Sequence, residues 1–121
     1  MVQEFPKERD AKRRLLLDAV ERIGPILQQS GPKSEEAGTL APEAVQALRD
    51  TGMFRLKLPA VVGGAEADPI TDMLVLEGLA YHDFASGWCT MVGATGIASA
   101  ELMAKVTRDG DYKSWTEKFL N

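Results

Sequence analysis

Glycines and prolines mark where helices begin and end in the middle of this sequence, and their positions limit the possible fold more than any other feature. Gly52 is placed to end a helix, because glycine adopts a left-handed conformation without steric cost. Five residues of alternating polarity, Phe54 to Leu58, then lead to Pro59. The pair Gly63–Gly64 turns the chain, and Asp68–Pro69 has the form of a helix start. The order predicts two helices joined by an extended connector, Phe54 to Leu58, which a proline ends before any sheet could form.

Two helices are expected before this connector. The first covers about Glu8 to Gln29, with Leu16, Val20, Ile23 and Leu27 at helical spacing. Gly24–Pro25 predicts a kink or a restart, because proline removes a backbone donor and clashes with the preceding turn. Ser30 to Gly38 is expected to be a polar loop, and the second helix is expected to begin near Pro42 and to end before Gly52.

The third helix is expected from Pro69 to about His82, with Asp68 as its cap. Its apolar residues surround most of its circumference, which predicts packing on several sides. These residues are Ile70, Met73, Leu74, Val75, Leu76, Leu79 and Ala80.

The fourth helix, about Ser86 to Val106, carries two sets of residues at helical spacing. A stripe of mostly large side chains comprises Trp88, Met91, Val92, Thr95, Ser99, Leu102, Met103 and Val106. A seam of small residues comprises Cys89, Gly93, Gly96 and Ala100. Phe84 to Ala100 is 17 residues without a charge, at the lower limit for crossing a bilayer, and a buried core helix is the expected interpretation. Tyr112 to Leu120 could form a short terminal helix, so the expected fold is a single all-α domain, residues 1–121, of four to five helices.

Composition excludes several functions. The 121 residues carry a net charge of −4 with a pI near 5.0, which gives no electrostatic reason to bind nucleic acid. One cysteine, Cys89, and one histidine, His82, cannot build a disulfide or a zinc site within one chain. The start, MVQEFPKERDAKRR, lacks the apolar core of a signal peptide, so a cytoplasmic location is expected. There is no Rossmann glycine pattern, phosphate loop or Ser-His-acid set.

Two stretches together resemble the N-terminal helical domain of the acyl-CoA dehydrogenase family of flavoproteins. They are APEAVQALRDTGMFRLKLPAVVGGAEAD, Ala41 to Asp68, and LEGLAYHDFASGW, Leu76 to Trp88. The matching positions are Gly52, Pro59, Gly63, Gly64, Leu79, Ala80, Asp83 and Ser86. The resemblance covers roughly Leu16 to Ala100 and leaves residues 101–121 as a divergent tail. Ser86–Gly87–Trp88 also looks like the flavin-dependent monooxygenases of the same fold.

The resemblance implies a larger enzyme than these residues contain. In the family a β-domain and a C-terminal bundle follow, FAD lies between them, and a glutamate of the last bundle removes the α-proton of an acyl-CoA thioester. Neither later domain is in this sequence, so no catalytic residue carries over and the chain alone is not expected to hold FAD. The family implies a small-molecule substrate such as an acyl-CoA. It also implies partners: further copies of the chain or a companion flavin-domain polypeptide.

One binding role carries over from the resemblance. The fourth helix of this domain forms a wall of the acyl pocket in the family, which places Trp88, Met91, Val92 and Thr95 along that wall. The alternative is that the same four residues are plain core. His82 is interpreted as a polar residue near a helix end and Cys89 as an inert packing residue.

Three interpretations of the chain as a whole stay open. It is part of a longer gene, one piece of a split enzyme, or a separate helical module that recruits or regulates a partner.

Overall fold

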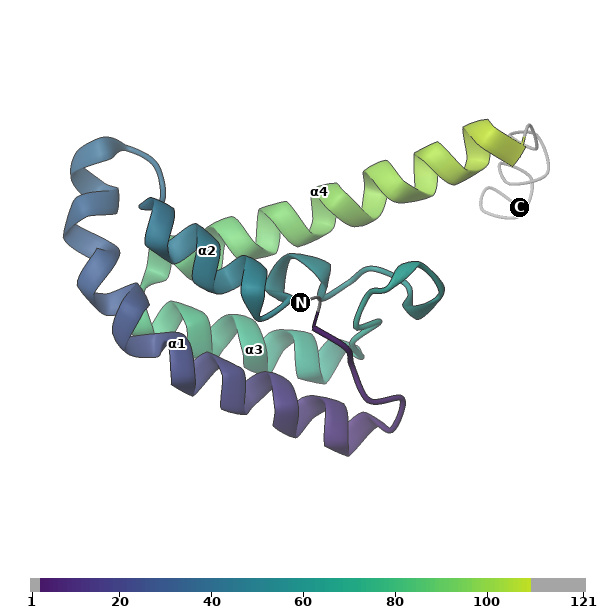
Figure 1. The fold of residues 1–121 in the computed structure, drawn as a ribbon, viewed down its shortest axis with the longest axis horizontal. Coiled ribbons are helices and arrows are strands. Elements are labelled where there is room, and N and C mark those ends of the chain that lie inside the picture. The colour runs from purple at the N-terminus through teal and green to yellow at the C-terminus, as the bar shows by residue number, and fades with distance from the viewer. Residues whose placement is uncertain (1–2, 110–121) are drawn as a thin grey trace.

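The computed structural model describes residues 3–109, with side chains through residue 96. Helix α1 covers Arg9–Ala37, α2 Pro42–Asp50, α3 Pro69–His82 and α4 Phe84–Asp109, and two single 3₁₀ turns lie between α2 and α3, at Met53–Arg55 and Ala60–Val62 (Figure 1). No strand occurs among the described residues, so the expected all-α fold is confirmed. The expected terminal helix at Tyr112 to Leu120 lies outside them, as do the side chains of Ser99, Ala100, Leu102, Met103 and Val106.

Helix α1 is longer than the sequence predicts. The polar loop expected at Ser30 to Gly38 is wrong, because the helix continues to Ala37 and ends at Gly38 in the left-handed conformation (φ 71°). Pro25 and Pro32 both lie inside it. The ribbon bends between the part that lies beside α3 and the part that leads toward α2 (Figure 1), as proline inside a helix predicts.

Serine hydroxyls support the second half of α1. Ser30 donates a hydrogen bond to the carbonyl of Ile26 (2.7 Å), and Ser34 donates to the carbonyl of Ser30 (3.0 Å). The Ser34 hydroxyl also accepts from the backbone N–H of Ala41, at 2.9 Å. Both serines are buried, so the residues that suggested a solvated loop are satisfied internally instead.

The segment Phe54 to Leu58 is not the extended connector that its alternation predicts. Met53–Arg55 forms a 3₁₀ turn, and Leu56 also has helical backbone angles (φ −56°, ψ −43°). The alternation has a simpler cause, because Leu56 and Leu58 are both buried in the core. The carbonyl of Leu58 accepts from the N–H of Glu66, and a Cβ placed on Gly64 would lie 2.0 Å from that same oxygen. The Gly63–Gly64 pair is therefore a close backbone approach within one loop.

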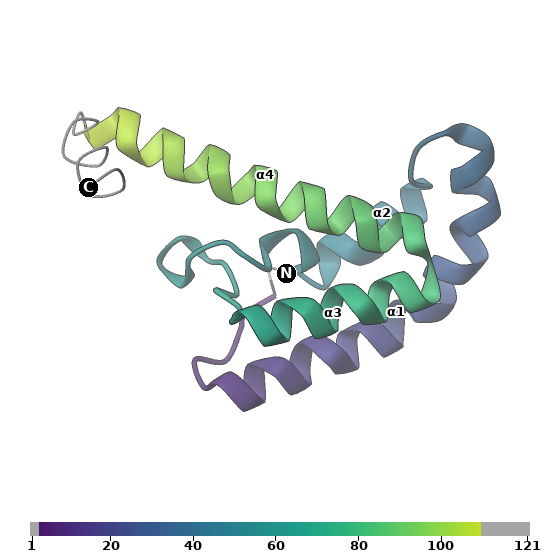
Figure 2. The same cartoon turned by 180° about the vertical axis from the view of Figure 1, so that it is seen from behind.

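Helix α3 lies between α1 and α4 (Figures 1 and 2), and α4 runs back antiparallel to it. The core between the helices is aliphatic, with Leu16 and Leu27 of α1, Leu48 of α2 and Leu79 of α3 fully buried. The helical spacing predicted for α1 is confirmed, since all four of its marked residues are buried.

Helix α3 does not pack on several sides, contrary to the expectation from its composition. Only Thr71, Val75 and Leu79 are buried. Ile70 is 60% exposed and Met73 is 69% exposed, although both are apolar. The inner side of α3 therefore contacts both neighbouring helices, and its outer face is largely apolar and uncovered within the described structure.

The α3–α4 pair is held close by glycine. A Cβ added to Gly87 would lie 2.9 Å from both the Cβ and the backbone nitrogen of Ala80 on α3. The connection between the helices is the single residue Asp83, whose carboxylate accepts hydrogen bonds from the backbone N–H and the hydroxyl of Ser86. The cap and the small residues together fix how α4 leaves α3.

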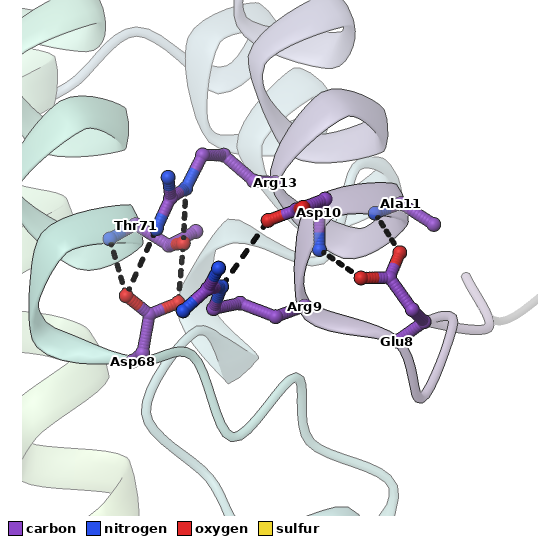
Figure 3. A network of polar contacts seen from close by, with 7 residues as sticks. All are labelled: Glu8, Arg9, Asp10, Ala11, Arg13, Asp68 and Thr71. Carbon is purple, nitrogen blue, oxygen red and sulfur yellow. Dashed lines mark hydrogen bonds and ion pairs between the residues drawn. The ribbon is translucent and has the colours of Figure 1, made fainter.

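A polar latch joins the start of α3 to α1 (Figure 3). Asp68 caps α3, as predicted, by accepting from the backbone N–H and the hydroxyl of Thr71. Arg13 of α1 donates from Nε to the Thr71 hydroxyl (2.9 Å) and from Nη2 to Asp68 (3.2 Å). These hydrogen bonds, first from the Thr71 side chain and backbone and then from Arg13, lower the pKa of Asp68 from its ordinary 3.8 to about 2.

Two alanine substitutions on α4 should have opposite effects on stability. Gly87→Ala should lower the free energy of unfolding by about 1–3 kcal/mol, because its methyl group would overlap backbone and side-chain atoms of Ala80. Gly96→Ala meets nothing within 4 Å and should raise stability by up to about 1 kcal/mol through helix propensity. Urea titration of both variants tests this, and equal effects would contradict the close approach at Gly87.

The latch predicts a defined pH dependence. Because the pKa of Asp68 is lowered in the folded state, its contribution is fully present above the unfolded pKa and is lost as the pH falls from about 4 to about 2. Asp68→Asn keeps a capping side chain but removes the charge. Its destabilisation relative to the native chain should therefore be constant above pH 5 and shrink toward zero near pH 2. Denaturant titrations at pH 6, 4 and 2 measure this, with the exposed Asp18→Asn as control; a difference independent of pH would refute it.

Candidate functional site

Helix α4 has one buried face and one exposed face along the part whose side chains are described. Ser86 and Thr90 are fully buried and Ala94 is 1% exposed, so these residues form the contact with the rest of the domain. They belong to neither the large stripe nor the small seam marked in the sequence. The sequence predicts a buried core helix for Phe84 to Ala100; the run is helical, but among residues 84–96, whose side chains are described, only this one face is buried.

The residues predicted to line a pocket lie on the opposite face. Trp88 is 57% exposed and Val92 is 53% exposed; Thr95 is also exposed, and Met91 is half-buried at the edge. The alternative interpretation, that the stripe is plain core, is wrong for Trp88, Val92 and Thr95. Four residues of α4 therefore form one surface, called here the α4 outer face: Trp88, Met91, Val92 and Thr95.

Among the seam residues whose side chains are described, one glycine lies close to a neighbouring segment. A Cβ on Gly93 would lie 3.2 Å from the Phe54 ring, so this glycine does admit a close neighbour. Gly96 has open space around it, and Cys89 is half-buried. The small seam is therefore no continuous helix contact within the described structure.

A polar cluster lies at the Thr95 end of the α4 outer face. Lys57 donates from Nζ to the Thr95 hydroxyl at 3.3 Å, and the same nitrogen lies 3.4 Å from a carboxylate oxygen of Asp72. The Thr95 hydroxyl donates to the carbonyl of Met91, at 2.8 Å. The side chains of Lys57 and Asp72 are 33% and 17% exposed, so the pair is partly sheltered. Sequence reasoning missed both residues, because they are distant in the chain and share no periodic pattern with α4.

His82 is the last residue of α3 and lies against the bend in α1. Its ring is the nearest group to Gly24, where an added Cβ would come within 2.7 Å of three ring atoms. One ring nitrogen is 3.3 Å from the Glu21 carboxylate and the other is 3.5 Å from the Gln28 amide. The contacts give His82 a packing role at the end of its helix.

A cavity of about 660 Å³ lies between the second half of α1 and the start of α4. Pro32, Leu40, Phe84 and Cys89 contribute to its mainly apolar lining. Its carboxylate-bearing lining residues are Glu35 and Asp83, and neither lysine nor arginine lines it. The cavity therefore does not fit the pyrophosphate of a flavin dinucleotide.

The loop at Gly63–Gly64 does not fit a phosphate group either. The N–H groups of Gly63 and Gly64 donate to the carbonyls of Ala60 and Pro59. The Arg55 guanidinium beside them donates to the carbonyls of Gly63 and Gln3. The two glycine N–H groups that would form a phosphate cradle are therefore already used within the loop. Across the described residues, no helix is long and apolar enough to cross a membrane, and no group of three potential metal ligands gathers.

Comparison with known proteins agrees with this all-helical architecture. The model of the "Acyl-CoA dehydrogenase, N-terminal domain" family matches residues 11–120. The chain belongs to this family.

Residues of the chain are also similar to the oxygenase subunit HsaA, a flavin-dependent monooxygenase of Rhodococcus jostii (strain RHA1). The two are 25% identical over 76 residues, which is 63% of this chain. The matched part is 20% of the relative, so the chain spans only about a fifth of that protein's length. No solved structure matches the chain.

The two faces of the domain predict opposite responses to the same substitution. Val92→Gln, on the α4 outer face, should change the free energy of unfolding by no more than about 0.5 kcal/mol and should reduce self-association. Val75→Gln, at a fully buried site of α3, should cost about 3 kcal/mol or more, because it buries an amide without partners. Thermal melts and analytical ultracentrifugation measure both. A Val92→Gln variant as unstable as Val75→Gln would show that the outer face is covered.

Proposed function

We propose that this chain is the acyl-pocket domain of a cytoplasmic, FAD-dependent oxidoreductase of the acyl-CoA dehydrogenase type. The observation that carries the proposal is the exposure of Trp88, Val92 and Thr95 on a helix whose opposite face is fully buried. Large apolar side chains left uncovered on a small domain mark a surface that another molecule covers. In this proposal, substrate and the flavin-carrying part of the enzyme cover it together.

The domain would contribute binding and exclusion of water, while the cofactor would supply the redox chemistry when bound elsewhere in the enzyme. Trp88, Met91 and Val92 present an aromatic ring, a flexible thioether and a branched aliphatic group, which suit an apolar acyl chain. The rigid contact of Ser86, Thr90 and Ala94 with the core would hold that wall in place. No catalytic residue is assigned to the described residues, and the isolated chain is expected to be inactive.

A flavin-dependent monooxygenase is the second candidate within the same fold. It is favoured by the similarity to the Rhodococcus oxygenase subunit, although that similarity covers a fifth of the relative. In this case the α4 outer face would line a pocket for a different small molecule. The role of the domain as a wall would be unchanged.

A non-catalytic helical interaction module is the candidate from a different class. It is favoured by apolar and aromatic side chains that are exposed outside the α4 outer face: Ile70 and Met73 of α3, and Tyr81 and Phe84 around the α3–α4 connection, are all more than half exposed. Further copies of the chain or a companion polypeptide would bury this surface. The enzyme proposal needs the same burial, so the two candidates differ in whether a flavoprotein partner exists.

The test has two parts: reading the DNA next to this gene, and reconstituting the enzyme from the chain and the product encoded there. We expect the DNA downstream of codon 121, in any frame, or a neighbouring gene, to encode a β-rich domain and a helical bundle. Joined or co-expressed with that product, the chain should yield a yellow protein, whereas the chain alone should retain no flavin after gel filtration. Trp88→Ala should then raise KM for the substrate at least severalfold without reducing flavin content, and the distant Lys33→Met should change neither. An unrelated downstream gene and no flavoprotein partner would favour the interaction module.

A further inference from the structure

The α4 outer face has a polar end and an apolar end. Thr95 and Trp88 are seven residues apart, which at 1.5 Å per residue places them about 10 Å apart along the helix axis. Lys57 and Asp72 stand at the Thr95 end, whereas Trp88 and Val92 present carbon surface toward the other. A ligand that lies along this face meets the Lys57 ammonium group at one end and the mostly apolar indole ring of Trp88 at the other.

Lys57 is fixed in place by its contacts. Its ammonium group carries three protons, and the structure directs it at two acceptors: the Asp72 carboxylate (3.4 Å) and the Thr95 hydroxyl (3.3 Å). One donor remains for a further acceptor, and the nitrogen's two partners come from α3 and α4. A donor held in position from two helices loses less conformational freedom on binding than an ordinary surface lysine.

The charge at this end of the face indicates which acceptor fits. Asp72 offsets the positive charge of Lys57, so the pair has little net attraction for a free carboxylate or phosphate. The remaining donor suits an uncharged oxygen, since a hydroxyl or carbonyl group is transferred into a sheltered site at lower cost than an anion.

We infer that Lys57 is a specificity-determining residue that donates a hydrogen bond to a hydroxyl or carbonyl oxygen at one end of an otherwise apolar substrate, whose body lies along Met91, Val92 and Trp88. This inference rests on the proposed function of the α4 outer face, and it adds the substrate class. An aliphatic acyl chain without a distal oxygen would leave the Lys57 donor unpaired and would bind less well than an oxygenated one.

The test compares two probes that differ by one oxygen, 4-butylphenol and butylbenzene. Binding to the full 121-residue chain is followed by the fluorescence of Trp88, with Trp115→Phe as background so that one indole reports. The phenol should bind about three- to tenfold more tightly, the range expected for one hydrogen bond. Lys57→Met should reduce this ratio to about one and leave the affinity for butylbenzene unchanged, while Lys57→Arg should keep most of it.

Controls separate this role from a structural one. Lys33→Met removes an exposed ion pair with Glu43, between α1 and α2 and not on the α4 outer face, and it should leave the ratio unchanged. A loss of stability in Lys57→Met, followed by circular dichroism, would lower both affinities together and would not alter their ratio. Equal binding of the two probes, or a ratio that persists in Lys57→Met, would overturn the inference while leaving the apolar wall intact. No binding of either probe would contradict both the inference and the proposed wall.

Discussion

The packing of α3 between α1 and α4 is the constraint on which the rest of the structure depends. Helix α3 has a fully buried strip, Thr71, Val75 and Leu79, and close contacts beside it, Gly78 with Val20 of α1 and Ala80 with Gly87 of α4. Each end of this arrangement is fixed by a polar cap: Asp68, held by Arg13 at the start of α3, and Asp83, which opens α4. Gly87 lets α4 pack closely against Ala80 of α3, so α4 has little freedom to change its orientation. In the described structure the outer faces of both helices stay uncovered.

That uncovered surface connects the fold with its family. A domain of this size that stood alone would bury its large apolar side chains, yet Trp88, Phe84 and Met73 are each more than half exposed. The chain belongs to a family described as an N-terminal domain, and the proposed function accounts for this surface: in that proposal, substrate and the rest of an enzyme would cover it. On the α4 outer face, the Lys57–Asp72 pair places a charged hydrogen-bond donor at one end, and mostly apolar side chains lie toward the other.

Most of the helices could be predicted because their signals are local. The caps at Asp68 and Gly52, the proline at the start of α2 and of α3, and the leucine spacing of α1 each act within one or two turns. The errors arose where residue type or alternation did not reveal which groups are buried and satisfied internally. Ser30 and Ser34 suggested a solvated loop, but their hydroxyls bond within α1 and to Ala41. Phe54 to Leu58 alternates like a strand because Leu56 and Leu58, which follow the 3₁₀ turn Met53–Arg55, are both buried in the core.

The sequence by itself determined the all-helical class, the helix starts at Pro42 and Pro69, the family and the stripe that became the α4 outer face. These features follow from the backbone preferences of individual residues and from the spacing of apolar residues at 3.6 per turn, both of which depend only on residues near in the sequence. The tertiary structure decided which faces are buried. Helix α3 is apolar nearly all round, so its own sequence could not select the strip that packs, and that choice required α1 and α4 in place. Lys57, Asp72 and Thr95 became one cluster for the same reason: they come from three segments, and only packing brings their polar atoms within 3.4 Å of the shared nitrogen.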